Sequence, residues 1–231
     1  GIVLNLRNNG GGALQDATLM AGLFIKKGPI VQVKDRGEAK IQEDVDNKVY
    51  WDKPLVVLIN RFSASASEIV AGALKDYNRA LIVGSSEQTH GKGTVQAIMN
   101  LQEMVNPFIA KYLPPIGAMK VTTDMFYRVN GMSTQFRGVK PDIELPDQFG
   151  YLESGEQSLD YAIPYAEVPA VKYDKWNKQV MSLPKLKSAS DKRVAKSEKF
   201  QKIIKSVAWS KERKDQTKRS IKLDEMEKFR K

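Results

Sequence analysis

The stretch PLVVLINRFSASASEIVAGALKDYNRALIVG, residues 54–84, decides the fold. Its first seven residues form an apolar run of strand length, which is typical of a strand in a sheet covered on both faces. After Ser65, apolar residues recur at helical spacing, at Ala66, Ile69, Val70, Ala73 and Leu74. ALIVG (80–84) is a second apolar run. This strand–helix–strand order predicts a layered α/β core.

The flanking segments extend the same alternation. Residues 1–6 alternate and are β-branched, and a glycine turn follows them. Further elements are expected as a helix over 13–27, a strand over 29–34, a loop or hairpin over 35–52 and a strand over 119–128. GVKPDIELP (138–146) closes the apolar region. Because a natural chain seldom starts in mid-sheet, we expect a fragment whose N-terminal part is missing.

The composition changes near residue 150. Residues 171–231 contain 20 Lys or Arg and 8 Asp or Glu, whereas the first 170 residues contain 17 and 19. Segments 189–208 and 210–230 have helical spacing, and Phe200, Ile203, Ile204 and Val207 form a candidate buried stripe. We therefore expect a core over 1–150 and a basic helical region over 151–231.

Composition excludes several kinds of site. The chain has no cysteine, which rules out disulfides, zinc thiolate sites, iron–sulfur clusters and cysteine nucleophiles. No apolar run approaches the roughly 20 residues of a membrane span, so no transmembrane segment is expected. No motif indicates a metal or an organic cofactor.

Three serines at alternate positions, Ser63, Ser65 and Ser67, precede the central helix. A serine nucleophile needs a base, and the chain has a single histidine, His90. A lysine with a pKa lowered by burial can serve instead, and Lys92 lies between glycines just after a buried strand. The alternatives are ordinary: serines before a helix are usually caps, and such a lysine is usually a solvated loop residue.

An acyl-transfer site also needs amides for an oxyanion. Gly10, Gly11 and Gly12 follow a strand and precede a helix, and the amide of Ala66 would follow a Ser65 nucleophile. A glycine triplet can equally be a plain turn or a phosphate cradle. Neither G-x-x-x-x-G-K-[ST] nor G-x-G-x-x-G is present, so nucleotide binding is poorly supported.

The segments LNLRNNGGG, VVLINRFSASASEIVAGALKDYNRALIVG, THGKGTVQ and STQFRGVKPDIELP, in this order, resemble the C-terminal processing peptidases of the tail-specific protease type. The resemblance covers residues 1 to about 147. It implies an α/β, ClpP/crotonase-like spiral core with a C-terminal basic α-helical extension. It also implies a serine protease in the periplasm or cell envelope, without cofactor or metal. Its substrates would be proteins or peptides with apolar, unstructured C-termini, with an adaptor protein as a possible partner.

Carried over position by position, the resemblance implies Ser65 as nucleophile and Lys92 as general base. Gln96 would orient the lysine, and Asp76 would stand where the family has an aspartate, although a structural role is favoured for it. The implied oxyanion donors are Ala66 and Gly11, with Gly12 as the next candidate. The family's PDZ domain lies upstream and is not found in this chain, so we expect weak or no processive activity from it.

Two departures from the family pattern stand out. His90 replaces the usual phenylalanine and is interpreted as a packed aromatic substitute. The loop GSSEQTHGK (84–92) is two residues longer than the common form, which can alter the approach of Lys92 to Ser65.

The rival hypothesis is a non-catalytic binding or scaffold protein whose basic tail contacts nucleic acid or another acidic partner. The tail has the charge, but its Lys and Arg residues are scattered and its aromatics are few. A solvated basic face is therefore favoured, and no nucleic acid is expected as a partner.

Overall fold

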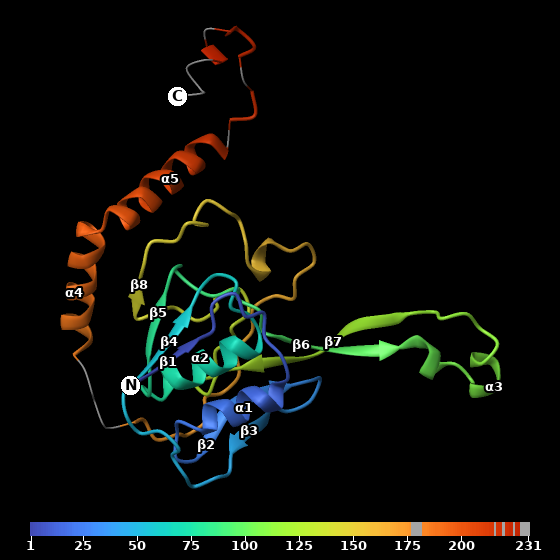
Figure 1. Ribbon diagram of the computed structural model, residues 1–231. Coiled ribbons are helices and arrows are strands. Elements are labelled where there is room, and N and C mark those ends of the chain that lie inside the picture. Colours follow the sequence, from blue (N-terminus) through green and yellow to red (C-terminus); the bar gives the residue numbers. More distant parts are fainter. Residues whose placement is uncertain (177–181, 215, 219, 224, 227–231) are drawn as a thin grey trace.

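Two four-stranded sheets organise the chain in the computed structural model, which describes residues 1–176, 182–214, 216–218, 220–223 and 225–226 (Figure 1). The first sheet has the order β1-β4-β5-β8, and its neighbours all pair in parallel. Its strands are β1 (Ile2–Asn5), β4 (Leu55–Ile59), β5 (Leu81–Gly84) and β8 (Ile143–Glu144).

The second sheet is antiparallel and has the order β3-β2-β7-β6. Its strands are β2 (Gly28–Lys34), β3 (Lys40–Asp44), β6 (Thr94–Asn100) and β7 (Ala118–Tyr127). The hairpin of β2 and β3 confirms one of the two forms expected for residues 35–52. The chain visits the two sheets in turn, so β6 and β7 lie in sequence between β5 and β8.

Two helices pack between these strands and complete the core. Helix α2 (Ala66–Asp76) is buried along its first nine residues, including the predicted apolar face. Helix α1 (Leu14–Gly22) packs against α2 and ends five residues before the predicted limit at Lys27. It ends there because the chain must turn after Leu23 to enter β2 at Gly28, whose positive φ of 131° suits only glycine.

Strands β6 and β7 extend beyond the core as a long hairpin (Figure 1). Its tip holds a short 3₁₀ helix, η1 (Leu101–Met104), and one turn of helix, α3 (Pro107–Ala110). Sequence analysis did not predict β6. Its outer residues are exposed on both faces, so no apolar alternation marks the strand.

The segment after β8 returns to the core. It contains a 3₁₀ turn, η2 (Glu156–Ser158), and reaches the C-terminal end of α2, where the amide of Trp176 donates to the carbonyl of Tyr77. The Gln135 side chain donates to the carbonyl of Ile163, and the amide of Val171 donates to the carbonyl of Val129. Residues up to Tyr173 therefore pack against the core, although the composition changes earlier.

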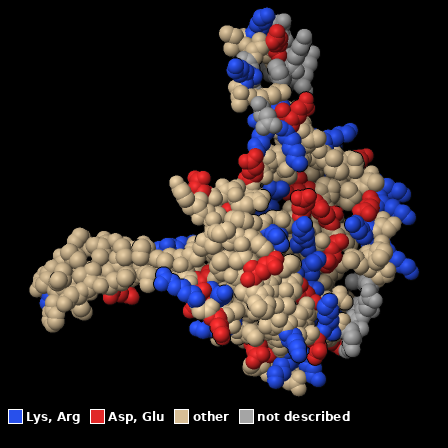
Figure 2. All heavy atoms as spheres, turned by 180° about the vertical axis from the view of Figure 1, so that it is seen from behind, with Lys and Arg blue, Asp and Glu red and all other residues tan. Residues whose placement is uncertain are grey.

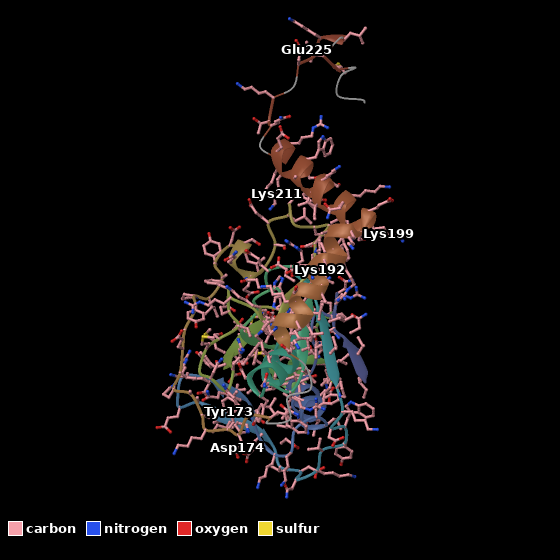
Figure 3. The ribbon with its side chains drawn as sticks, turned by 90° about the vertical axis from the view of Figure 1, so that its left-hand side faces the viewer. Tyr173, Asp174, Lys192, Lys199, Lys211 and Glu225 are labelled. Carbon is pink, nitrogen blue, oxygen red and sulfur yellow. The ribbon has the colours of Figure 1, made fainter. Side chains whose placement is uncertain are left out.

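Two helices follow, α4 (Leu183–Lys196) and α5 (Glu198–Lys214), shown in Figure 3. The prediction of one helix over 189–208 was wrong in its bounds. Ser197 has an extended backbone and begins α5, because the amides of Phe200 and Gln201 donate to its side chain and carbonyl. Beyond Lys214 the predicted second helix, over 210–230, falls partly outside the described residues.

The candidate apolar stripe of the tail is only half-buried. Phe200, Ile203 and Val207 are partly covered, whereas Ile204 is 44% exposed. Helix α5 contacts α4, and Lys214 at its end pairs with Glu153, but these contacts leave part of its apolar side open. Among the described residues, none of the helices combines the length and the apolar character needed to cross a membrane.

Candidate active site

The three serines have different environments at the start of α2. Ser63 is fully buried, and its hydroxyl donates to the carbonyl of Leu6 at 2.8 Å and accepts the amide of Asn60 at 3.0 Å. Ser67 is also buried, within the first turn of the helix. Ser65 is the N-cap residue and lines a cavity. Of the three, only Ser65 faces open space.

Ser65 has a strained backbone, with φ 55° and ψ −118°. A positive φ is uncommon for a residue other than glycine, and such strain costs of order 1–3 kcal/mol. It persists only where the surrounding structure imposes it, and it is often found at active sites. The strain at Ser65 therefore supports a functional role for this position.

The Glu68 carboxylate connects Ser65 to the lysine loop. It is fully buried and accepts the amides of Ser65, Gly91 and Lys92 at 2.8, 2.8 and 2.9 Å. The Thr89 hydroxyl donates to the same carboxylate. One side chain thus fixes the backbone of both predicted catalytic residues, although they are 27 positions apart in the sequence.

Sequence analysis missed Glu68. Its signal was its place three residues after the N-cap serine, where a glutamate completes a capping box. Burial raises the pKa of Glu68 to about 7, against the lowering effect of its four hydrogen bonds. A carboxylate surrounded by donors in a buried position is a positioning group rather than a solvated cap.

Lys92 is half-buried and lines the same cavity as Ser65. Burial lowers the pKa of Lys92, and the nearby charge of Glu156 partly opposes this effect. Its amine donates to the carbonyl of Thr94 at 2.8 Å. In the described part of the chain, no hydrogen bond joins this amine to the Ser65 hydroxyl. Catalytic contacts are often loose without substrate, so this geometry is compatible with a serine–lysine pair.

The glycine turn lies against the start of α2. A Cβ atom added at Gly11 would lie 2.8 Å from the Cβ of Ser65 and 3.0 Å from the nitrogen of Ala66. The Gly11 amide, however, already donates to the side chain of Asn9 at 2.9 Å. Gly12 lines the cavity together with Ser65 and Ala66. The turn therefore presents Gly12 to the cavity and uses the Gly11 amide internally.

A cavity of about 180 Å³ joins these groups. Apolar side chains form much of its wall: Leu14, Ile69, Val95, Ile98 and Phe126. Its polar lining includes Gln96 and Lys120, which come from β6 and β7. Gln96 follows a shift in the pairing of β6 with β7, and it lines the same cavity as Lys92.

Asp76 lies at the opposite end of α2. Its carboxylate accepts two hydrogen bonds from Arg128 and one from Asn130 at 3.1 Å. It is eleven positions after Ser65, which corresponds to about 16 Å along the helix at 1.5 Å per residue. Asp76 is thus held in an ion pair at the helix C-terminus and is not brought to the cavity.

His90 also lies outside the cavity lining. Its ring nitrogen is 3.5 Å from a carboxylate oxygen of Glu156, and its backbone amide donates to the carbonyl of Ser63. The backbone of His90 thus helps to attach the long loop to the serine segment, and its role as a packed aromatic substitute stays a prediction.

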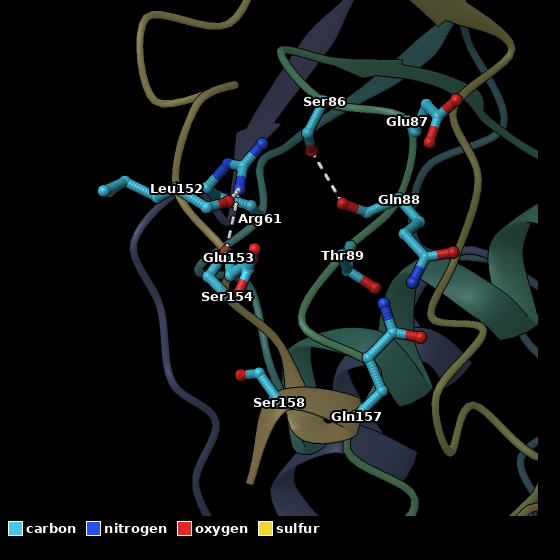
Figure 4. A pocket seen from close by; sticks show the side chains of 10 residues that line it. All are labelled: Arg61, Ser86, Glu87, Gln88, Thr89, Leu152, Glu153, Ser154, Gln157 and Ser158. Atoms are coloured by element: carbon cyan, nitrogen blue, oxygen red, sulfur yellow. Dashed lines mark hydrogen bonds between the residues drawn. The ribbon is translucent and has the colours of Figure 1, made fainter. Parts of the chain in front are cut away.

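A second, polar pocket of about 540 Å³ is lined in part by the loop over residues 86–89 (Figure 4). Arg61 lies at its edge and donates to Asp147, Ser154 and the carbonyl of Leu152. None of the predicted site residues lines this pocket. Within the described residues, no group of three or more His, Asp or Glu side chains could hold a metal ion.

Comparison with protein families identifies the chain. Residues 1–145 match the model of peptidase family S41, which is well over half of the sequence. The chain belongs to peptidase family S41. Residues 149–231 match a second model, the C-terminal domain of tail-specific protease. The predicted resemblance is therefore confirmed at the level of the family.

Individual relatives in family S41 agree with this assignment. The tail-specific protease of Haemophilus influenzae is 43% identical over 173 residues, covering 74% of this chain and 24% of the relative. The carboxy-terminal-processing protease of Bartonella bacilliformis is 41% identical over 172 residues, covering 69% of this chain and 35% of the relative. The chain thus spans about a quarter to a third of the length of these relatives.

A solved structure supports the fold. The photosystem II D1 C-terminal processing protease aligns with a TM-score of 0.52 at 35% sequence identity, covering 62% of this chain and 34% of that one. The mixed α/β architecture expected from the sequence is thereby confirmed.

Proposed function

We propose that this chain is the catalytic region of a serine endopeptidase that cleaves proteins or peptides selected by an apolar, unstructured C-terminus. Ser65 is the nucleophile and Lys92 is the general base. One observation carries the proposal: a single buried carboxylate, Glu68, binds the amides of both residues at the edge of one cavity.

The bonds that form and break in the proposed reaction involve the substrate, these two side chains and water. Neutral Lys92 takes the hydroxyl proton of Ser65, and the serine oxygen attacks the scissile carbonyl. The lysinium then gives this proton to the departing amine as the peptide bond breaks, leaving an acyl ester on Ser65. Lys92, neutral again, deprotonates a water molecule that attacks the ester. The returned proton restores the Ser65 hydroxyl and releases the carboxylic acid.

The oxyanion of each tetrahedral intermediate needs two amide donors. The amide of Ala66, at the first turn of α2, is one donor, and the helix dipole supports it. Gly11 and Gly12 are the candidates for the other. The bond from the Gly11 amide to Asn9 favours Gly12, which borders the cavity.

The remaining predicted residues, Gln96 and Asp76, act indirectly, by positioning other groups. Gln96 orients the Lys92 amine from its position on the cavity wall. Asp76 serves α2 through its pairing with Arg128, so we assign it a structural role. The apolar wall of the cavity and its small volume suit one apolar side chain of the substrate next to the scissile bond.

The wider setting of the protein is inferred from its relatives. We infer a ClpP/crotonase-like spiral core, which is supported by the repeated passage of the chain between the two sheets. We also infer a periplasmic or cell-envelope location. We propose that the whole protein selects its substrate by the C-terminus of that substrate. Binding of an adaptor protein is likewise proposed for the whole protein.

The test is cleavage of a short fluorogenic peptide with an apolar C-terminus and of a matched peptide with an acidic C-terminus. We expect the protein to cleave the apolar peptide preferentially, Ser65→Ala to be inactive, and Ser67→Ala to retain activity if it folds. Circular dichroism verifies that each variant is folded. Cleavage of the apolar peptide by Ser65→Ala at the wild-type rate would refute the assignment of Ser65 as the nucleophile.

A further inference from the structure

The hairpin of β6 and β7 carries an unusual surface on its outer half. We define the arm as residues 98–119, which include the tip helices η1 and α3. The arm contains only two charged residues, Glu103 and Lys111, although charged residues make up 28% of the chain. Figure 2 shows it as a projection with almost no charged atoms on the face in view.

The arm is also apolar and open to solvent. Phe108 and Tyr112 at its tip are 77% and 79% exposed. Its other exposed apolar side chains are Ile98, Met99, Met104, Ile109, Leu113, Ile116 and Met119. A contiguous exposed surface of this kind marks an interaction site in a soluble protein.

The tip is held together by its own hydrogen bonds. The side chain of Gln102 donates to the carbonyl of Ala110 at 2.6 Å and accepts the amide of Ile116 at 3.3 Å. The Asn106 side chain accepts the amide of Phe108 and begins α3. Polar groups thus fix the backbone internally, and this leaves the apolar side chains pointing outward on a defined platform.

The arm begins at the wall of the active-site cavity. Ile98 and Lys120 are paired across the two strands, and both line the cavity. Moreover, β6 is the edge strand of its sheet, so its outer backbone groups are open to another strand. A polypeptide leaving the cavity along this edge would reach the arm without crossing other parts of the fold.

From this continuity we propose that the arm is a binding surface for the substrate itself, outside the cavity: it holds an unfolded, apolar stretch of the polypeptide being cleaved. This inference rests on the proposed function. The near absence of charge suits apolar sequence rather than an acidic or basic partner. Three methionines, Met99, Met104 and Met119, provide flexible side chains that adapt to many sequences.

The test separates binding from cleavage. In the Ser65→Ala background, the full chain is titrated with fluorescently labelled, reduced and carboxymethylated α-lactalbumin, a permanently unfolded protein. The arm variant is Phe108→Ser/Tyr112→Ser. Its matched control is Leu159→Ser/Tyr161→Ser, which removes an exposed aliphatic and an exposed aromatic residue away from the arm. We expect the arm variant to weaken binding at least about tenfold, because exposed aromatic anchors dominate such contacts, and the control to leave it unchanged.

Kinetics with the active protein complete the test. The arm variant should raise the KM for unfolded α-lactalbumin by a similar factor and leave kcat/KM for a short peptide unchanged. Equal binding by the arm variant and the parent protein would overturn the proposal, even if cleavage is intact. Arm-dependent binding without any cleavage would uphold this surface and refute the proposed protease activity instead. A concentration-dependent dimer that the arm variant abolishes, with binding of α-lactalbumin unaffected, would assign the arm to self-association and overturn the proposal.

Discussion

At the scale of single residues, Ser65, the proposed nucleophile, has an unfavourable backbone conformation and lines the cavity. Its φ of 55° is imposed by the helix behind it and by the glycine turn that packs against it. Glycine would adopt this conformation without strain. We therefore predict that the free energy of unfolding of Ser65→Gly is about 1 kcal/mol higher than that of Ser65→Ala. Both variants lose the hydroxyl, so the comparison isolates the backbone strain. Urea denaturation of the two variants tests this, and equal stabilities would contradict the strain at Ser65.

Glu68 makes stability depend on pH. Its ordinary pKa of 4.5 is raised to about 7 by burial, so the folded state holds a proton that the unfolded state releases between these values. This contribution to stability is fully present below about pH 4.5 and is lost as the pH rises through about 7. We predict that the wild type loses up to about 1.4 kcal/mol per pH unit in this window relative to Glu68→Gln.

The measurement is urea denaturation of both proteins at several pH values between 5 and 8. The glutamine variant is the control because it keeps the shape of the side chain and cannot ionise. Parallel dependence of the two unfolding free energies on pH would show that Glu68 keeps an ordinary pKa.

The sequence alone indicated which candidate residues the structure brings together, where short motifs carry them. Ser65 and Lys92 each lie in a short motif, and the structure places both at one cavity. Glu68 was missed because the burial of a carboxylate depends on the loop that folds over it, 21 to 24 residues further along. The engagement of the Gly11 amide by Asn9 likewise depends on the geometry of the turn.

At the scale of elements, α2 is held at both ends. Glu68 fixes its beginning, and the pair of Asp76 with Arg128 fixes its end against the strand β7 and the turn that follows. Both side chains of this pair are nearly buried, with 7% and 11% exposure. Loss of one partner leaves the other charge buried without compensation.

We predict that Asp76→Asn lowers the free energy of unfolding by about 3 kcal/mol. The control is Glu167→Gln, which breaks the exposed pair of Glu167 with Arg137 and should cost less than about 1 kcal/mol. Under conditions where Asp76→Asn is folded, its kcat should stay close to that of the wild type. A large fall in kcat with unchanged stability would instead give Asp76 a direct role in the chemistry.

Most elements of the core were predictable because their apolar residues follow a clear period. The strands β1, β4 and β5 and the helix α2 are of this kind. Strand β6 was not, because its exposed residues show neither alternation nor burial. The arm it forms with β7 depends on pairing between distant segments, which no local pattern encodes.

At the scale of the whole molecule, the net positive charge of the chain comes from its C-terminal region. On α5, Lys199 and Lys211 are twelve residues apart, so their side chains lie about 120° apart around the helix axis. Figure 3 shows them with Lys192 along the two C-terminal helices. Tight binding of single-stranded nucleic acid also needs aromatic side chains on which bases stack, and the tail has few of them.

We therefore predict only weak binding to single-stranded DNA, with a Kd above about 10 µM at about 150 mM salt. Fluorescence anisotropy with a labelled oligonucleotide over a range of salt concentrations measures it. A truncation would disturb the packing of the tail, so the intact chain is used. Tight binding that weakens steeply with salt would support the rival scaffold function.

The central claim, that Lys92 activates Ser65, is tested most directly by covalent labelling with a fluorophosphonate probe followed by peptide mapping. The account predicts that the label falls on Ser65 and decreases roughly a hundredfold in Lys92→Arg, since an arginine stays protonated and cannot act as a base. Lys120→Arg is the matched control, because Lys120 lines the same cavity, and it should label like the wild type. Label on another serine, or equal labelling of Lys92→Arg and the wild type, would contradict the account.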